Sequence, residues 1–273
     1  MDWTNKRESP GSGNRRRVLR LAGHPVAVVA LLAIAFGDRA AAQGTFKIES
    51  AGPPPAAIPR EVTTNLQADG TRLLRVVNGI DKPLAELWWV RKLPLRGSHK
   101  KEDGAAYGEL VPGRMVAVLR VVAPIEDLRN QKLAPGFYTA RYAQLDRKSL
   151  ELAAKNDADD DEKGRGGDDV PMAVEYRDYV ALARLESDTQ TGAKLSLAKL
   201  FQLSRRVLRS REPVMLALPA LNPAYRAFPY AVSDDLGNCA VQFKIPARVA
   251  SGKTGELRIA ILLVNPPNVS KDD

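Results

Sequence analysis

The feature that most constrains this chain is an alternation of apolar and polar residues with a period of two, which recurs after residue 43. It is clearest in three stretches: Arg114–Val122, Ala240–Ile245 and Glu256–Val264. In the first, every second residue from Met115 to Val121 is apolar. Because successive side chains of a strand point to opposite faces, each stretch is predicted to be a half-buried strand over a core.

Seven further segments are predicted to be strands on weaker patterns, and turn dipeptides such as Asn78-Gly79 and Pro135-Gly136 separate them. Many short strands without recurrent helices between them favour antiparallel pairing, for which a two-layer sandwich is the usual architecture. We therefore predict an all-β fold, an antiparallel β-sandwich over residues 43–273. The seven segments are Thr45–Glu49, Arg72–Val77, Leu84–Lys92, Phe137–Leu145, Val174–Leu185, Val214–Leu218 and Tyr230–Ser233.

One stretch, about Leu195–Ser210, is predicted to be a short helix. Ser196 can cap its first turn, and apolar residues recur at helical spacing behind it. Two interpretations stay open for the arginines at its end: a group that binds an anion, or an ordinary solvated helix face. These arginines are Arg205, Arg206, Arg209 and Arg211.

The first 42 residues have the organisation of an export signal. A polar, basic region is followed by the apolar run Pro25–Phe36, which at 12 residues is too short for a hydrocarbon core that needs about 20. Ala40-Ala41-Ala42 then provides small residues for cleavage. We predict a secretory signal peptide cleaved after Ala42, with an uncleaved anchor helix over Val18–Phe36 as the alternative.

The segment Asn14–Arg20 resembles the twin-arginine export motif through Arg15 and Arg16, with Asn14 and Val18 as departures from it. Export by either route predicts a periplasmic or extracellular protein without a stable transmembrane segment after processing. Export also separates the chain from nucleic acid, so we expect no nucleic-acid partner.

Residues 43–273 carry 34 Lys/Arg and 29 Asp/Glu, a net charge of +5. This mild excess suits an anionic partner such as a polysaccharide or a membrane surface, and it also suits an ordinary soluble surface. Cys239 is the single cysteine, which excludes an intramolecular disulfide and a cysteine-based metal site. We predict that it is a buried structural thiol.

The sequence lacks the residues that several common catalytic mechanisms require. His99 is the one histidine after residue 42, it lies in a basic loop, and no Gly-x-Ser-x-Gly elbow accompanies it. A hydrolytic zinc site usually needs several His or Cys ligands, and no phosphate-binding glycine motif is present. We therefore assign no catalytic residue and no cofactor, and whether the chain is an enzyme stays uncertain.

The charged, glycine-rich segment 156–169 is predicted to be a mobile surface loop. Its aspartates match positions 1, 3, 5 and 12 of a twelve-residue calcium loop. Glu162 stands where that loop needs glycine, and an aspartate replaces the usual final glutamate, so calcium is only an alternative to a solvated loop. The matching residues are Asp157, Asp159, Asp161 and Asp168.

A pair of carboxylates for glycoside hydrolysis is a further possibility that chain spacing does not decide. Glu86 beside Trp88 and Trp89 is the kind of neighbourhood that a sugar site uses. The alternative is that one tryptophan belongs to the core and the other is half-exposed.

Five short segments carry a resemblance: Leu84–Trp89, Leu133–Thr139, Tyr176–Tyr179, Leu203–Arg206 and Val214–Leu218. Together they resemble a group of uncharacterised exported bacterial proteins with immunoglobulin-like or transthyretin-like sandwich folds. The resemblance implies a fold and a compartment, and no activity. We expect a binding or structural module of the cell envelope, with an envelope glycan or envelope protein as partner. A carboxylate-based hydrolase acting on an envelope glycan and a calcium-dependent binding module are the alternatives.

Overall fold

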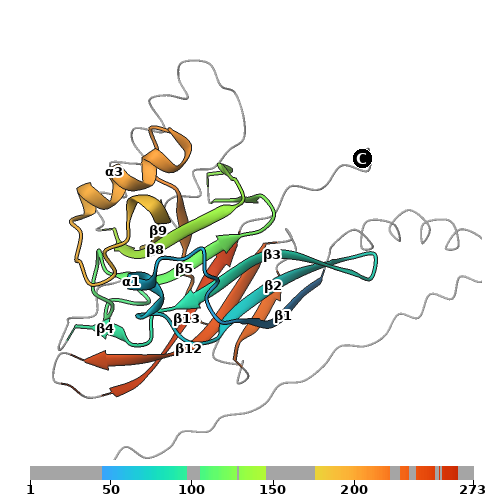
Figure 1. Cartoon of the computed structure of the whole chain (residues 1–273), viewed down its shortest axis with the longest axis horizontal. Coiled ribbons are helices and arrows are strands. Elements are labelled where there is room, and N and C mark those ends of the chain that lie inside the picture. The colour runs from blue at the N-terminus through green and yellow to red at the C-terminus, as the bar shows by residue number, and fades with distance from the viewer. Residues whose placement is uncertain are drawn as a thin grey trace, which may run out of the picture. The chain divides into compact units, whose positions relative to one another are not determined.

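The structure is a computed structural model that describes residues 45–96, 105–127, 129–145, 176–221, 228–233, 238–249, 252 and 254–263. Most of these residues lie in strands, and nearly all strand pairs are antiparallel (Figure 1). This confirms the predicted mainly antiparallel β class. Among the residues described, no helix is long and apolar enough to cross a membrane.

The larger sheet has seven strands in the order β1-β2-β3-β5-β8-β9-β10, and every neighbouring pair in it is antiparallel. Each strand overlaps a segment predicted from the sequence. The strands are β1 (Thr45–Gly52), β2 (Gly70–Val77), β3 (Ile80–Trp89), β5 (Met115–Val121), β8 (Gly136–Gln144), β9 (Asp178–Arg184) and β10 (Met215–Ala217).

The second sheet has four strands: β11 (Tyr230–Ser233), β12 (Cys239–Val249), β13 (Thr254–Leu263) and β4 (Leu93–Leu95). Strand β4 pairs with β12 in parallel, which differs from the predicted antiparallel pairing. A small hairpin joins β6 (Ile125–Glu126) to β7 (Lys132–Leu133). The pattern at β4, β6 and β7 is too short to show a period, so the sequence did not predict these strands.

The predicted helix is confirmed as α3 (Leu197–Leu208), and the Oγ of Ser196 accepts a hydrogen bond from the Lys199 backbone N–H as its cap. The one-turn helix α1 (Arg60–Thr63) follows the proline-rich segment and was not predicted, because four residues show no helical period. A 3₁₀ turn, η3 (Leu185–Ser187), follows β9.

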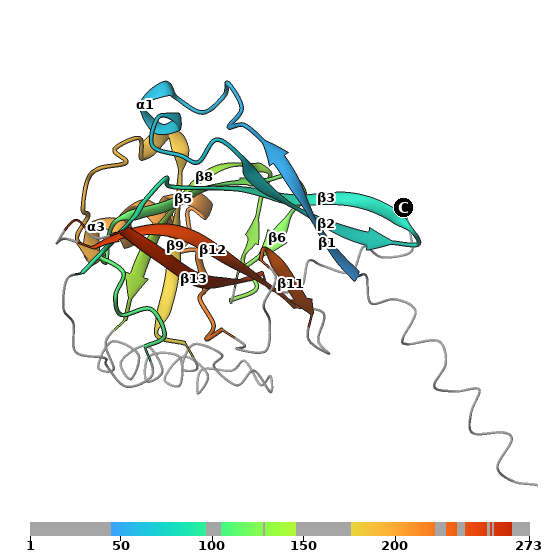
Figure 2. The same cartoon turned by 90° about the horizontal axis from the view of Figure 1, so that it is seen from below.

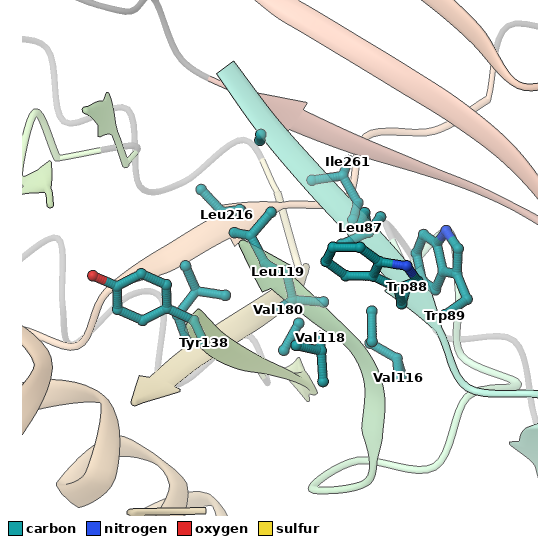
Figure 3. Packing of buried hydrophobic residues seen from close by; sticks show 14 of the residues in the cluster. Leu87, Trp88, Trp89, Val116, Val118, Leu119, Tyr138, Val180, Leu216 and Ile261 are labelled. Carbon is teal, nitrogen blue, oxygen red and sulfur yellow. The ribbon is translucent and has the colours of Figure 1, made fainter. Parts of the chain in front are cut away.

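Residues of both sheets contribute to the main core. The rings of Trp89 on β3 and Phe243 on β12 meet edge to face, with centroids 5.0 Å apart. Leu119, Val180 and Ile261 contribute to the same cluster (Figure 3). The single thiol, Cys239, is buried as predicted.

Both faces of β5, β8 and β9 are covered, which corrects the prediction that Arg114–Val122 is half-buried. In β12 and β13 the prediction of half-buried strands is confirmed, because Lys244 and Arg258 are exposed between buried residues. In β5, Arg120 is the one residue that is partly exposed. Figure 2 shows α1 on the side of this sheet away from β12 and β13. Along β9, Val180 belongs to the main core, whereas Tyr179 packs with Leu200 of α3. Helix α3 therefore helps to bury the outer face of β9.

Tyr107 joins the two sheets where β10 and β13 lie beside each other. Its hydroxyl donates to the Pro219 carbonyl (2.8 Å) and accepts from the Ala260 backbone N–H (2.9 Å). Asp178 fixes the segment that carries Tyr107 by accepting the backbone N–H groups of Ala106 (2.6 Å) and Tyr107 (3.2 Å). The Tyr107 hydroxyl thus provides an acceptor for the Ala260 N–H of β13.

Candidate functional site

Several residues predicted from the sequence lie outside the described residues. They are Arg15, Arg16 and Ala42 of the export signal, His99, and the aspartates Asp157, Asp159, Asp161 and Asp168. Within the described ranges, no group of three His, Cys, Asp or Glu side chains is placed to hold a metal ion.

The interpretation of Trp88 and Trp89 as a sugar-stacking surface is wrong. Their exposed fractions are 1% and 3%, so neither ring face is open to a ligand. The alternative, one core ring and one half-exposed ring, is right about a core ring but wrong about a half-exposed one, because both rings are buried. The adjacent Glu86 is buried and ion-paired with Arg72 (2.8 Å) and Arg120 (3.0 Å). An apolar strand covered on both faces accounts for this outcome.

The buried carboxylates of the described residues all accept hydrogen bonds from the protein itself. Asp178 binds the Tyr142 hydroxyl as well as two backbone N–H groups, and Asp188 binds Arg141 and Thr139. Asp127 accepts from the backbone of Arg129, Gln131 and Met215, while its burial raises its pKa. These carboxylates hold loops and strand ends in place.

The exposed side of α3 carries a group of basic residues. Between residues 189 and 211 there are six Lys/Arg and no Asp/Glu. We call five of these residues the basic patch: Lys199, Arg205, Arg206, Arg209 and Arg211. At 100° per residue, its four members from Lys199 to Arg209 fall within one third of the helix circumference. The arginines predicted as a possible anion site therefore lie together and are exposed.

The arginines of the basic patch have no partner among the residues that the structure describes. None of their guanidinium groups forms an ion pair or a hydrogen bond with the part of the chain that the structure describes. The nearest acid in sequence, Glu212, is ion-paired with Arg129 of the β6–β7 hairpin. Their charges therefore remain available to an outside anion.

The scaffold beneath the patch is firmly fixed. Leu200, Leu203 and Val207 are buried, and the Ser204 hydroxyl donates to the Val214 carbonyl at 2.9 Å. Arg209 ends the helix in the left-handed conformation, with φ at 54°. An anchored helix loses little conformational freedom when a partner binds its outer face.

The chemistry of the patch is that of anion recognition. Guanidinium groups present planar forks of N–H donors that match carboxylate, sulfate and phosphate. The negative end of the helix dipole accounts for arginines in the last turn, Arg205 and Arg206. Arg209 and Arg211 lie beyond that turn, so the positive charge exceeds what capping the helix requires.

A comparison with protein families, curated proteins and solved structures finds no match for this chain.

Proposed function

We propose that this chain is an exported binding module of the bacterial cell envelope, a β-sandwich released from its signal peptide, which binds an anionic envelope glycan through the basic patch. The observation that carries the proposal is a group of four exposed arginines, at the end of an anchored helix and just after it, whose guanidinium groups have no partner within the described residues. A surface that serves only solubility usually mixes positive and negative side chains, whereas this segment carries positive side chains only.

The length of the basic patch favours a polymeric glycan over a small single anion. At a rise of about 1.5 Å per residue, Lys199 and Arg209 are separated by about 15 Å along the axis of α3. A chain of acidic sugars can contact such charges in sequence, and each contact adds affinity. Export, predicted from Arg15, Arg16 and the Ala42 cleavage site, brings the domain to a compartment rich in such polymers.

The alternatives have less support. A carboxylate-based hydrolase needs two acids facing one cleft, and the buried acids of the described residues serve as structural acceptors. A calcium-dependent module would depend on Asp157–Asp168, outside the described residues. No specific contact favours either one.

The test is binding of purified chain to polygalacturonate, an acidic polysaccharide, with neutral dextran as the control polymer. The double variant Arg205→Glu/Arg209→Glu should weaken binding at least tenfold at 0.15 M salt. The matched variant is Arg60→Glu/Arg248→Glu, two exposed arginines outside the patch with the same change of net charge. It should stay within about twofold of the wild type.

Equal losses in the two double variants would contradict the proposal, because they would indicate attraction to net charge alone. Equal binding to dextran and polygalacturonate would contradict it as well. Melting curves of both variants establish that each is folded.

A further inference from the structure

A row of side chains that crosses the large sheet brings two arginines to one carboxylate. Arg72 of β2 and Arg120 of β5 both pair in register with Glu86 of β3, which lies between them. Phe137 of β8 follows Arg120 in the same row. Residues directly opposite each other in an antiparallel sheet point to the same face, so the two guanidinium groups flank Glu86 on one face.

Glu86 and Phe137 hold the two guanidinium groups in place. Nε of Arg72 donates to Oε1 of Glu86 at 2.8 Å, and Nη1 of Arg120 donates to Oε2 of Glu86 at 3.0 Å. The Arg120 Cζ also lies over the Phe137 ring, 5.6 Å from its centroid, where a cation is attracted to the ring. Two anchored arginines lose little side-chain freedom when a ligand binds them.

The row carries more positive charge than the buried carboxylate requires. Glu86, with 5% of its side chain exposed, neutralises one of the two arginines, whose side chains are 34% and 43% exposed. Glu49 of β1 lies opposite Arg72 in register, but its carboxylate pairs with Lys47 at 3.1 Å. Neither arginine forms a further ion pair or hydrogen bond within the described ranges, so their other N–H groups remain available to a ligand.

We propose that Arg72 and Arg120, held by Glu86, form a binding site for a single phosphate or sulfate group. Each guanidinium presents a fork of N–H donors that matches two oxygens of such an anion. A tetrahedral anion has oxygens for both forks, whereas a carboxylate satisfies only one. The site lies on β2 and β5, apart from the basic patch on α3, and it does not depend on the proposed glycan binding.

The test is a titration of the full chain with inorganic phosphate at constant ionic strength, followed by NMR of the arginine Nε–H groups. The expected result is a saturable shift at Arg72 and Arg120, and none at the exposed arginines Arg60 and Arg248. The same titration with glucose 6-phosphate distinguishes an ester-bound group from a free anion, since the tighter ligand identifies the source. Absent shifts with both ligands, or shifts as large at Arg60 and Arg248, would overturn the proposal.

Lysine variants separate the guanidinium forks from charge alone. Arg72→Lys/Arg120→Lys keeps both charges beside Glu86 but replaces each fork by a point charge. Calorimetry should show phosphate binding weakened at least tenfold, whereas Arg60→Lys/Arg248→Lys should leave it unchanged. The single variant Arg120→Lys serves in the same role if the double variant does not fold. Undiminished binding in a folded lysine variant would overturn the assignment.

The patch variant Arg205→Glu/Arg209→Glu shows whether the two sites are separate. It should lose polygalacturonate binding and keep the phosphate-dependent shifts at Arg72 and Arg120. Failure of the glycan proposal would therefore leave these shifts in place, and failure of the phosphate site would leave polygalacturonate binding in place. Loss of the Arg72 and Arg120 shifts in the folded patch variant would overturn a separate site.

Discussion

Arg141 and Asp188 form a bidentate ion pair in the interior, with Nε–Oδ2 and Nη2–Oδ1 distances of 2.6 and 2.7 Å. The side chain of Arg141 has an exposed fraction of 0% and that of Asp188 4%. Arg141 also donates to the carbonyls of Gly113, Gln190 and Ala193. The pair therefore fastens the segment that leads into α3 onto strand β8, and it sets the position of the basic patch.

Breaking this pair should be costly. Arg141→Met leaves a buried carboxylate without its cation, and we expect a loss of about 3–5 kcal/mol in the free energy of unfolding. The double variant Arg141→Met/Asp188→Leu should lose less than the sum of its single variants, because no charge remains unpaired. Urea unfolding at pH 7 measures all three. Lys244→Met, in the exposed pair with Glu256, should change stability by less than about 1 kcal/mol.

The Tyr107 hydroxyl should stabilise the seam between β10 and β13. In Tyr107→Phe the Ala260 N–H and the Pro219 carbonyl both lose their partner, and a buried group left unsatisfied costs about 1–3 kcal/mol. Hydrogen exchange at Ala260 should accelerate more than global destabilisation explains. Ile80→Val, at a side chain that is 60% exposed, should alter neither quantity. Unchanged exchange at Ala260 would contradict the role assigned to Tyr107.

The strands were predictable because the apolar period acts locally, and each predicted strand or helix within the described residues overlaps an observed one. Burial of the outer sheet face could not be predicted, since it depends on segments distant in sequence: Leu200 of α3 belongs to the same buried cluster as Tyr179 of β9. For the same reason Trp88 and Trp89 were open to a surface interpretation. Of the candidate site, the arginines were visible in the sequence, but their lack of partners among the described residues was not.

Alkaline pH should destabilise the fold steeply. Burial raises the pKa of four tyrosines, that of Tyr179 to about 12 and those of Tyr107, Tyr138 and Tyr142 also above the ordinary value of 10. The unfolded chain loses these protons first, so the contribution is complete below pH 10 and is lost as pH rises toward the folded values. Each tyrosine should add a slope of about 1.4 kcal/mol per pH unit in that interval.

The measurement is urea unfolding from pH 9 to 11.5, with absorbance at 295 nm to follow tyrosine ionisation. Four of the seven tyrosines should ionise only together with unfolding. Tyr142→Phe should reduce the slope, although it weakens the fold at pH 7 by removing the hydrogen bond to Asp178. Ionisation of all seven before unfolding would contradict the burial of these hydroxyls.

Gly113 should tolerate no side chain. A comparison with Gly79 separates the effect of its backbone conformation from that of its close contact. The φ of Gly113 is +79°, and a Cβ there would lie 1.9 Å from the carbonyl oxygen of Leu195. That carbonyl cannot readily retreat, because the Leu195 N–H donates to the Gly113 carbonyl at 3.1 Å. Gly79, in the turn between β2 and β3, has a φ of +75° but nothing within 4 Å of a Cβ.

Both alanine variants therefore carry the strain of a left-handed backbone, about 1–2 kcal/mol, and only Gly113→Ala adds a collision with backbone. We expect Gly113→Ala to be the less stable by at least about 2 kcal/mol in urea unfolding. Since Leu195 leads into α3, the variant should also weaken polygalacturonate binding, whereas Gly79→Ala should not. Equal stabilities would show that the approach of Gly113 to Leu195 is looser than the structure has it, and that α3 is held mainly by Arg141.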